Sequence, residues 1–116
     1  MSVEACVFCR IARGEASATM LHRDTRLLAF RDLHPMAPVH ILIVPVRHLE
    51  SINDAYASDA TLLGEMLLLA RRIAKQESVE GTGYRLVINT GAEAGQSVHH
   101  LHMHLLAGRR MQWPPG

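Results

Sequence analysis

The sequence has no excess of either charge and no long apolar run. Its 12 Lys and Arg residues are interspersed with 11 Asp and Glu residues, and the formal net charge is +1. A basic surface for nucleic acid or for an anionic membrane is therefore not expected. No stretch approaches the roughly 20 apolar residues that cross a bilayer, and the beginning of the chain has no apolar signal-peptide core. These absences predict a cytoplasmic protein that binds neither nucleic acid nor membrane.

Cysteine is nearly absent as well. Cys6 and Cys9 are the only two, and they lie too close together in the sequence for a structural disulfide that would cross-link distant parts of the fold. In a cytosolic protein such a pair is metal-binding, redox-active or incidental.

Internal repeats, linkers and a P-loop are also missing, so the 116 residues are expected to form one domain, 1–116. A domain of this size buries a real core, and an oligomer would help it to do so.

Apolar periodicity and turn residues predict an α+β fold in which strands gather around one long helix. A short helix is expected from Val7 to Gly14. The long helix is expected over 58–78, capped by Asn53 or Asp54. Its predicted apolar face consists of Leu62, Leu63, Met66, Leu67, Leu69, Ala70, Ile73 and Ala74. The expected strands cover 20–22 and 26–31, which form a hairpin, and then 40–46, 84–89 and 98–106.

The last of these strands carries three histidines at alternate positions. His100, His102 and His104 would share one face, because successive side chains of a strand point to opposite faces. Leu101, Met103 and Leu105, together with His99, would lie on the core side. Three titratable rings on one supported face indicate a functional site. The alternatives are exposed histidines without a role and a three-histidine metal site.

The stretch from His100 to Leu106 resembles the His-φ-His-φ-His-φ-φ signature (φ, apolar) of the histidine triad (HIT) superfamily. Asn89, the tripeptide 95–97 and the closing segment 108–116 are similar to the HINT branch. That branch consists of purine nucleoside phosphoramidases and adenylyl hydrolases. The resemblance implies a HIT-like antiparallel meander of about five strands, with one long helix and a short N-terminal helix.

The resemblance also assigns roles to four histidines. His102 would be the nucleophile that attacks phosphorus and forms a nucleotidyl-histidine intermediate. A backbone carbonyl and His40 would select the tautomer of that nucleophile. His104 would contact the phosphoryl oxygens or the leaving group. His100 would be structural or would join a metal site.

A nucleotide pocket follows from the same resemblance. Asp32 would accept both ribose hydroxyls, since an ionised carboxylate only accepts hydrogen bonds. The purine would lie in an apolar slot, and the phosphate would be held by residues before the histidine strand. The slot residues are Phe8, Ile11, Phe30 and Leu33, with Val7; the phosphate residues are Asn89, Gly95, Gln96 and Ser97.

The cysteine pair resembles the structural zinc site of many bacterial HIT proteins. The implied ligands are Cys6, Cys9, His48 and His100, a closed tetrahedral set. Zinc would then be structural, and catalysis would require no cofactor. The resemblance further implies a homodimer, in which segment 109–116, with Trp113, reaches toward the partner's active site.

The expected function is hydrolysis of adenosine 5′-phosphoramidates and related aminoacyl or acyl adenylates to AMP. Three alternatives stay open on the sequence. The first is a dinucleoside polyphosphate hydrolase or nucleotidyl transferase. The second is a nucleotide-binding regulatory module, and the third is a zinc-dependent hydrolase that uses the triad as ligands.

Overall fold

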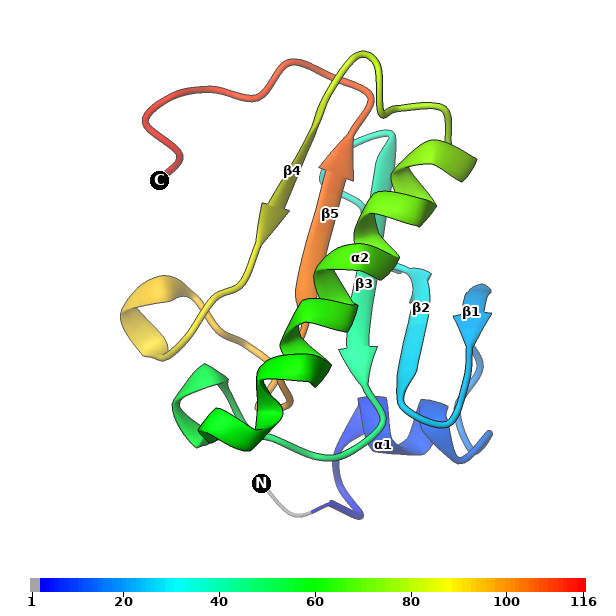
Figure 1. Cartoon of the computed structure of the whole chain (residues 1–116), viewed down its shortest axis with the longest axis vertical. Helices are drawn as coiled ribbons and strands as arrows, with labels where there is room; N and C mark the ends of the chain where they lie inside the picture. Colours follow the sequence, from blue (N-terminus) through cyan, green and yellow to red (C-terminus); the bar gives the residue numbers. More distant parts are fainter. Residues whose placement is uncertain (1–2) are drawn as a thin grey trace.

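The computed structural model describes residues 3–116, so the first two residues of the predicted domain 1–116 lie outside the described part. One five-stranded antiparallel sheet has the order β1-β2-β3-β5-β4, with the long helix α2 lying across it (Figure 1). The strands are β1 (Met20–Arg23), β2 (Leu27–Arg31), β3 (Val39–Pro45), β4 (Tyr84–Val87) and β5 (Met103–Ala107). The helices are α1 (Val7–Ala12), α2 (Ala60–Gln76) and the short 3₁₀ turns η1 (Ile52–Asp54), η2 (Ala57–Asp59) and η3 (Ala92–Ala94). The predicted α+β class is confirmed.

Alternation along the central strands divides the core between the two faces of the sheet. Ile41 and Ile43 of β3 join the α2 side, where Met66 is fully buried. Leu42 and Val44 join the α1 side. Period-2 alternation therefore gives each helix its own layer of aliphatic side chains, and the side chains of β5 follow the same rule.

The predicted hairpin is confirmed between β1 and β2. Asp24 Oδ1 accepts hydrogen bonds from the backbone N–H groups of Arg26 and Leu27, at 2.7 and 2.8 Å. Such a side-chain bond to the following backbone is how aspartate closes a tight turn. The hairpin brings β2, with Phe30 at its end, beside β3.

The long helix begins later than predicted. Asn53 and Asp54 belong to η1, and Asp59 is the residue that precedes α2. The buried Asp59 carboxylate accepts from Tyr56 N–H and pairs with Arg47, so it closes η2 rather than capping α2 with its side chain. Leu67 was also misplaced, because 51% of it is exposed while most of the predicted apolar face is buried.

The predicted histidine strand 98–106 is correct only in its second half. β5 starts at Met103, opposite Ile43, and residues 98–102 leave the ladder. The partner strand β3 ends at Pro45, which has no N–H to continue the pairing. Leu101 N–H donates instead to Leu49 O at 2.6 Å. His99 is exposed and does not join the core side.

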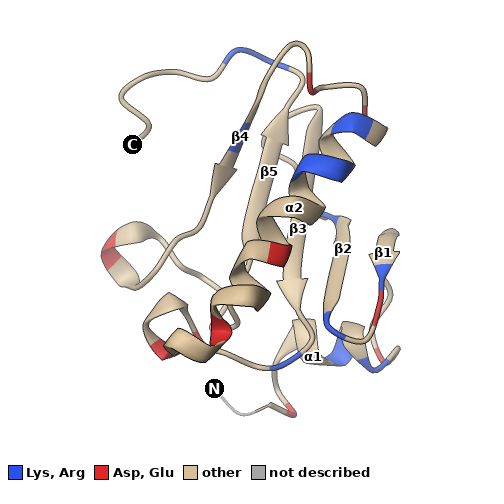
Figure 2. Ribbon diagram, in the orientation of Figure 1, with Lys and Arg blue, Asp and Glu red and all other residues tan. Residues whose placement is uncertain are grey.

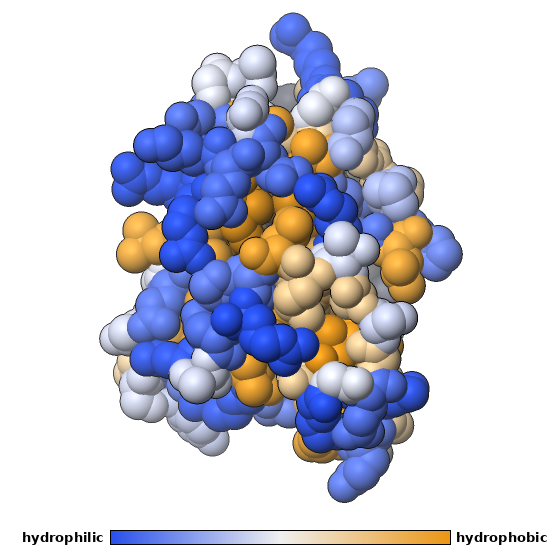
Figure 3. All heavy atoms as spheres, turned by 90° about the vertical axis from the view of Figure 1, so that its right-hand side faces the viewer, coloured by the Kyte–Doolittle hydropathy of each residue, from blue (hydrophilic) through white to orange (hydrophobic). Residues whose placement is uncertain are grey.

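Charged residues are spread along the chain, with Lys and Arg enriched at the C-terminal half of α2 (Figure 2). On the face shown in Figure 3, apolar side chains near the centre are framed by hydrophilic ones. Among residues 3–116, no helix has the length and apolar character needed to cross a membrane.

Candidate functional site

His102 lies at the boundary between the irregular segment and β5, packed under α1. Its ring is 5.2 Å from that of Phe8 and 5.0 Å from that of His104, and only 6% of the residue is exposed. His102 Nδ1 is 2.7 Å from the backbone oxygen of His100. Because a carbonyl only accepts, His102 Nδ1 carries the proton and donates it. In the neutral ring the other nitrogen, Nε2, therefore keeps its lone pair.

His104 lies on β5 directly opposite Leu42, and its contact is with His40. His104 Nδ1 and His40 Nε2 are 2.9 Å apart. The sequence assigned His40 to the support of His102, whereas in the structure it bonds to His104. Asp32 Oδ2 lies 3.4 Å from the same His40 nitrogen. The backbone carbonyl predicted for His102 is present, and it is that of His100.

Burial makes this histidine pair difficult to protonate. Burial, followed by positive charge on His102 and on His40, lowers the pKa of His104 to about 4, while the Asp32 carboxylate opposes the shift. Burial also lowers the pKa of His40, while the Asp32 carboxylate opposes that shift. Both rings are consequently neutral at pH 7 and act as hydrogen-bonding groups rather than as cations.

A cavity of about 260 Å³ opens beside these rings on the α1 face of the sheet. It runs from His104 on β5 past Leu42 on β3 and Phe30 on β2 to Ser17 and Ala18, which precede β1. Of the predicted nucleotide residues, the structure places seven in its lining: Val7, Phe8, Ile11, Phe30, Asp32, Leu33 and Ser97. The lining is mainly apolar at the α1 end and polar near the histidines.

Asp32 sits where the apolar and polar parts of the cavity meet. Its Oδ1 accepts from His34 N–H at 2.8 Å, and its own N–H donates to His40 O at 3.0 Å. The carboxylate is thereby fixed in orientation, while each of its oxygens retains a further lone pair for a ligand hydroxyl.

Four predicted ligand residues do not line the cavity: Asn89, Gly95, Gln96 and Trp113. The Gln96 side chain is committed to the loop, since Oε1 accepts from Gly91 N–H and Nε2 donates to the Glu50 and Val98 carbonyls, at 3.0, 2.7 and 3.1 Å. Trp113 is 82% exposed. Gln96 therefore fixes the segment that leads into the histidines through these hydrogen bonds.

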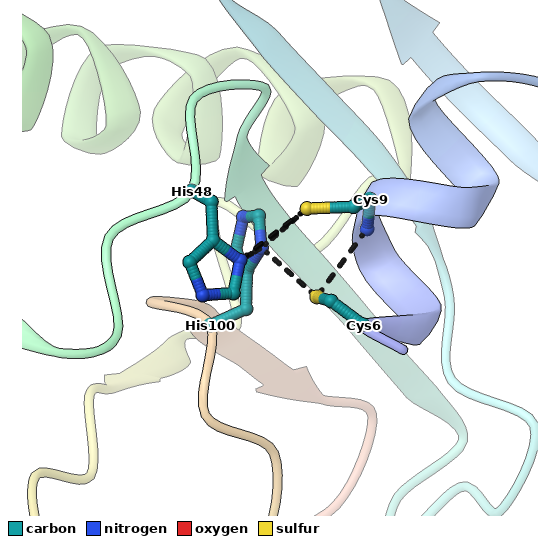
Figure 4. Close-up of side chains that lie close together, drawn as sticks. All are labelled: Cys6, Cys9, His48 and His100. Carbon is teal, nitrogen blue, oxygen red and sulfur yellow. Dashed lines mark hydrogen bonds between the residues drawn. The ribbon is translucent and has the colours of Figure 1, made fainter. Parts of the chain in front are cut away.

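A second cluster brings together residues up to 94 positions apart (Figure 4). The four predicted metal ligands Cys6, Cys9, His48 and His100 have one donor atom each within 4.8 Å of all the others. Cys6 Sγ lies 3.3 Å from His100 Nδ1, and Cys9 Sγ lies 3.3 Å from His48 Nδ1. The two Nδ1 atoms are 3.1 Å apart.

These residues fit a tetrahedral zinc ion. Zinc–nitrogen bonds of about 2.0–2.1 Å and zinc–sulfur bonds of about 2.3 Å imply ligand separations of roughly 3.3–3.8 Å, close to the spacing found here. His100 Nε2–H donates to Pro45 O at 2.8 Å, which leaves its Nδ1 lone pair directed into the cluster. Burial first, and then Cys6, raises the pKa of the Cys9 thiol to about 11. A bound cation would offset that cost of thiolate formation.

Sequence reasoning missed the far end of the cavity and several backbone groups. Leu42, Ser17 and Ala18 line the cavity, yet each looks like an ordinary core or loop residue. The carbonyls of Pro45 and His100 fix two histidine tautomers. Backbone groups carry no residue-type signal, so only the three-dimensional register reveals them.

Comparison with known proteins agrees with this fold. The family profile described as "Scavenger mRNA decapping enzyme C-term binding" matches residues 5–113. An uncharacterised HIT-like protein of Synechococcus elongatus is 48% identical over 97% of this chain and 98% of its own length. A HIT family hydrolase from Legionella pneumophila is 49% identical, covers 96% of this chain and 99% of its own, and superposes with a TM-score of 0.94.

A zinc-bound histidine triad family protein from Mycobacterium smegmatis is 30% identical over 93% of this chain and 78% of its own, with a TM-score of 0.81. The antiparallel sheet and the three alternating histidines define a histidine triad protein. The chain therefore belongs to the HIT superfamily and, within it, to the family that the matching profile describes.

Proposed function

We propose that this protein is a hydrolase that cleaves the P–N bond of purine nucleoside 5′-phosphoramidates, or the P–O bond to the acyl group in related acyl adenylates, and releases the nucleoside monophosphate, which is AMP for adenosine substrates. The observation that carries the proposal is the hydrogen bond from His102 Nδ1–H to His100 O, at 2.7 Å. It leaves an unprotonated Nε2 on a buried ring that lines a cavity. A nitrogen lone pair fixed beside a pocket is what nucleophilic attack on phosphorus requires.

The cavity supports a purine nucleotide as the ligand. Phe8 and Phe30 pack edge to face with centroids 5.6 Å apart at its apolar end, which suits a flat base. The Asp32 carboxylate suits the ribose diol, and the Ser97 hydroxyl suits a phosphate oxygen. With the base at the α1 end, the α-phosphate lies beside His102 and His104.

The reaction then has two displacements. The lone pair of His102 Nε2 forms a bond to phosphorus, the P–N bond of the substrate breaks, and the amine leaves with a proton taken from solvent. Water next attacks the same phosphorus, the bond to His102 Nε2 breaks, and the proton of water returns to solvent. The neutral His104 donates a hydrogen bond to a phosphoryl oxygen in both steps.

Metal has no part in these steps. The four ligands Cys6, Cys9, His48 and His100 would hold a structural zinc ion, which would fix the segment before β5. We further propose a single cytoplasmic HIT domain that forms a homodimer, with segment 109–116 at the edge of the partner's active site. Exposed Leu67 on α2 supports the dimer.

The test is turnover of a fluorogenic adenosine 5′-phosphoramidate by wild type, His102→Ala and His99→Ala, with chelator present. We expect wild type and His99→Ala, which changes an exposed histidine, to turn over the substrate. His102→Ala should lose activity by several orders of magnitude. Wild type denatured at alkaline pH during turnover should carry an AMP moiety on His102, detected by peptide mass spectrometry under non-acidic conditions.

Other results would favour the alternatives. Faster cleavage of a dinucleoside polyphosphate than of the phosphoramidate would make the protein a polyphosphate hydrolase. AMP binding without turnover of either substrate would indicate a regulatory nucleotide-binding module. Loss of turnover on chelation, restored by zinc, in a protein that stays folded and still binds AMP would indicate metal catalysis and contradict the covalent mechanism.

A further inference from the structure

The loop of residues 32–38, which connects β2 to β3, is tied to the segment that follows β5. Arg109 Nε donates a hydrogen bond to Met36 O at 3.1 Å. Gly108 has φ +91°, and a Cβ at this glycine would lie 2.8 Å from Pro38 Cβ. The two chain segments are thus in direct contact at Gly108 and bonded at Arg109, although they are about 70 residues apart.

The loop delivers one backbone amide to the histidine pair. Met36 N–H donates to His40 Nδ1 at 3.0 Å. An amide N–H only donates, so His40 Nδ1 carries no proton and the neutral ring is protonated on Nε2. The nearer acceptor for that Nε2–H is His104 Nδ1, 2.9 Å away, whereas Asp32 Oδ2 lies at 3.4 Å.

The same reasoning fixes the proton of His104. Its Nδ1 accepts from His40, so its own proton is on Nε2, the nitrogen that is not engaged by His40. His104 lines the cavity and is neutral at pH 7 because burial lowers its pKa to about 4. A neutral imidazole stabilises a phosphoryl oxygen only if its N–H faces that oxygen.

We propose that loop 32–38, held by Gly108 and Arg109, is a positioning element that uses the Met36 amide to keep His104 protonated on Nε2. The inference rests on the proposed function for its catalytic consequence. The assignment of the protons stands on the geometry alone. His40, Met36 and Arg109 are positioning residues, because each acts on the substrate through His104.

The first experiment removes the amide and keeps the rest of the loop. Met36→Pro deletes the N–H, and Met36→Ala, which shortens a side chain that is 70% exposed, is the matched reference. Histidine ¹⁵N NMR should show His104 protonated on Nε2 in wild type and Met36→Ala, and a mixture of tautomers in Met36→Pro. We expect kcat of Met36→Pro to fall about tenfold, with KM changed less than about threefold.

A second pair of variants keeps the proposal testable if Met36→Pro does not fold. Arg109→Ala removes the bond to Met36 O, and Arg110→Ala removes the same charge from the neighbouring exposed position without touching the loop. Only Arg109→Ala should alter the His104 tautomer signals and lower kcat.

An unchanged tautomer pattern in both Met36→Pro and Arg109→Ala would overturn the proposal, even if His102→Ala abolishes activity. If His102→Ala stays active, the proposed function fails, while the NMR spectra still decide whether the loop fixes the proton of His104.

Discussion

At the residue scale, the histidines of this chain differ in role because they differ in surroundings. His102 is fixed by a carbonyl, His104 by another imidazole, and His100 by both a carbonyl and two thiols. Exposed His99 sits beside His100 and shares none of these contacts. The role of each histidine therefore depends on the hydrogen-bond partners of its ring nitrogens more than on its presence in the motif.

The neutrality of His104 should be visible as a pH dependence of stability. In the unfolded chain it takes up a proton near its ordinary pKa of 6.5, and in the folded chain only near 4. Between these values the unfolded state binds more protons, so the free energy of unfolding decreases as the pH falls from about 6.5 to about 4. Above that window the contribution is fully present.

The check is thermal unfolding of wild type, His104→Gln and His99→Gln between pH 7.5 and 4. The loss of Tm on acidification should be about 4 °C smaller in His104→Gln than in wild type. His99→Gln should follow the wild-type curve, because that ring is exposed. Parallel curves for all three proteins would contradict a depressed pKa at His104.

At the element scale, α1 is held by its buried cysteines together with its buried apolar side chains. It is six residues long, and its N-cap Cys6 accepts from Cys9 N–H at 3.4 Å. So short a helix is not stable alone. It nevertheless supplies Phe8 and Ile11 to the cavity wall. Zinc at the cluster would therefore hold one wall of the nucleotide cavity in place.

Removing a metal ligand should loosen α1. Cys9→Ser is expected to reduce bound zinc from about one ion per chain to nearly none and to lower Tm by about 10 °C. Wild type treated with a chelator should show the same Tm as the chelated variant. An unchanged Tm of wild type on chelation, with no zinc in the purified protein, would contradict a structural zinc site.

Most elements were predictable from sequence because their signals are local. The hairpin has Asp24 at its turn, and Leu62, Met66 and Ile73 follow the helical period. The start of β5 was not predictable, because the alternating pattern continues through Leu101 after the partner strand has ended at Pro45. The start of this strand is therefore set by backbone pairing with β3 and not by the alternation of apolar residues in the sequence.

The site was predictable to a different extent. The metal ligands followed from the motif resemblance, and the structure brings Cys6, His48 and His100 together as expected. The cavity residues followed only in part, since four predicted ligand residues lie outside the cavity and its far end was missed. The hydrogen bond between His40 and His104 and the hydrogen bonds of the Gln96 side chain within its loop were not predictable. Both depend on which atom of a side chain faces which neighbour, and a sequence contains only the side-chain type.

At the scale of the whole molecule, one edge of the sheet and one side of α2 lack a covering layer in residues 3–116. β4 pairs only with β5, and Leu67 is 51% exposed. Leu68 is 62% exposed as well, but it lines a shallow groove with His22 and Arg72 on the β1 side. An open strand edge beside an exposed leucine is suited to a second copy of the chain.

The dimer can be tested with two neighbouring leucines. Light scattering should give wild type a mass near twice 12.9 kDa. Leu67→Glu should shift it toward the monomer, and Leu68→Glu, on the other side of the helix, should remain dimeric. A monomeric wild type at micromolar concentration would contradict the homodimer.

Because β5 starts late, the residues before it that line the cavity are not the residues that pair in the sheet. Ser97 and Val98 line the cavity but precede the ladder, and loop 32–38 likewise contributes Leu33 and His34 from outside any strand. Substitutions at these positions do not interrupt a backbone pair of the sheet. The substrate range of this scaffold should therefore be open to redesign by changing these few side chains, with little cost in foldability.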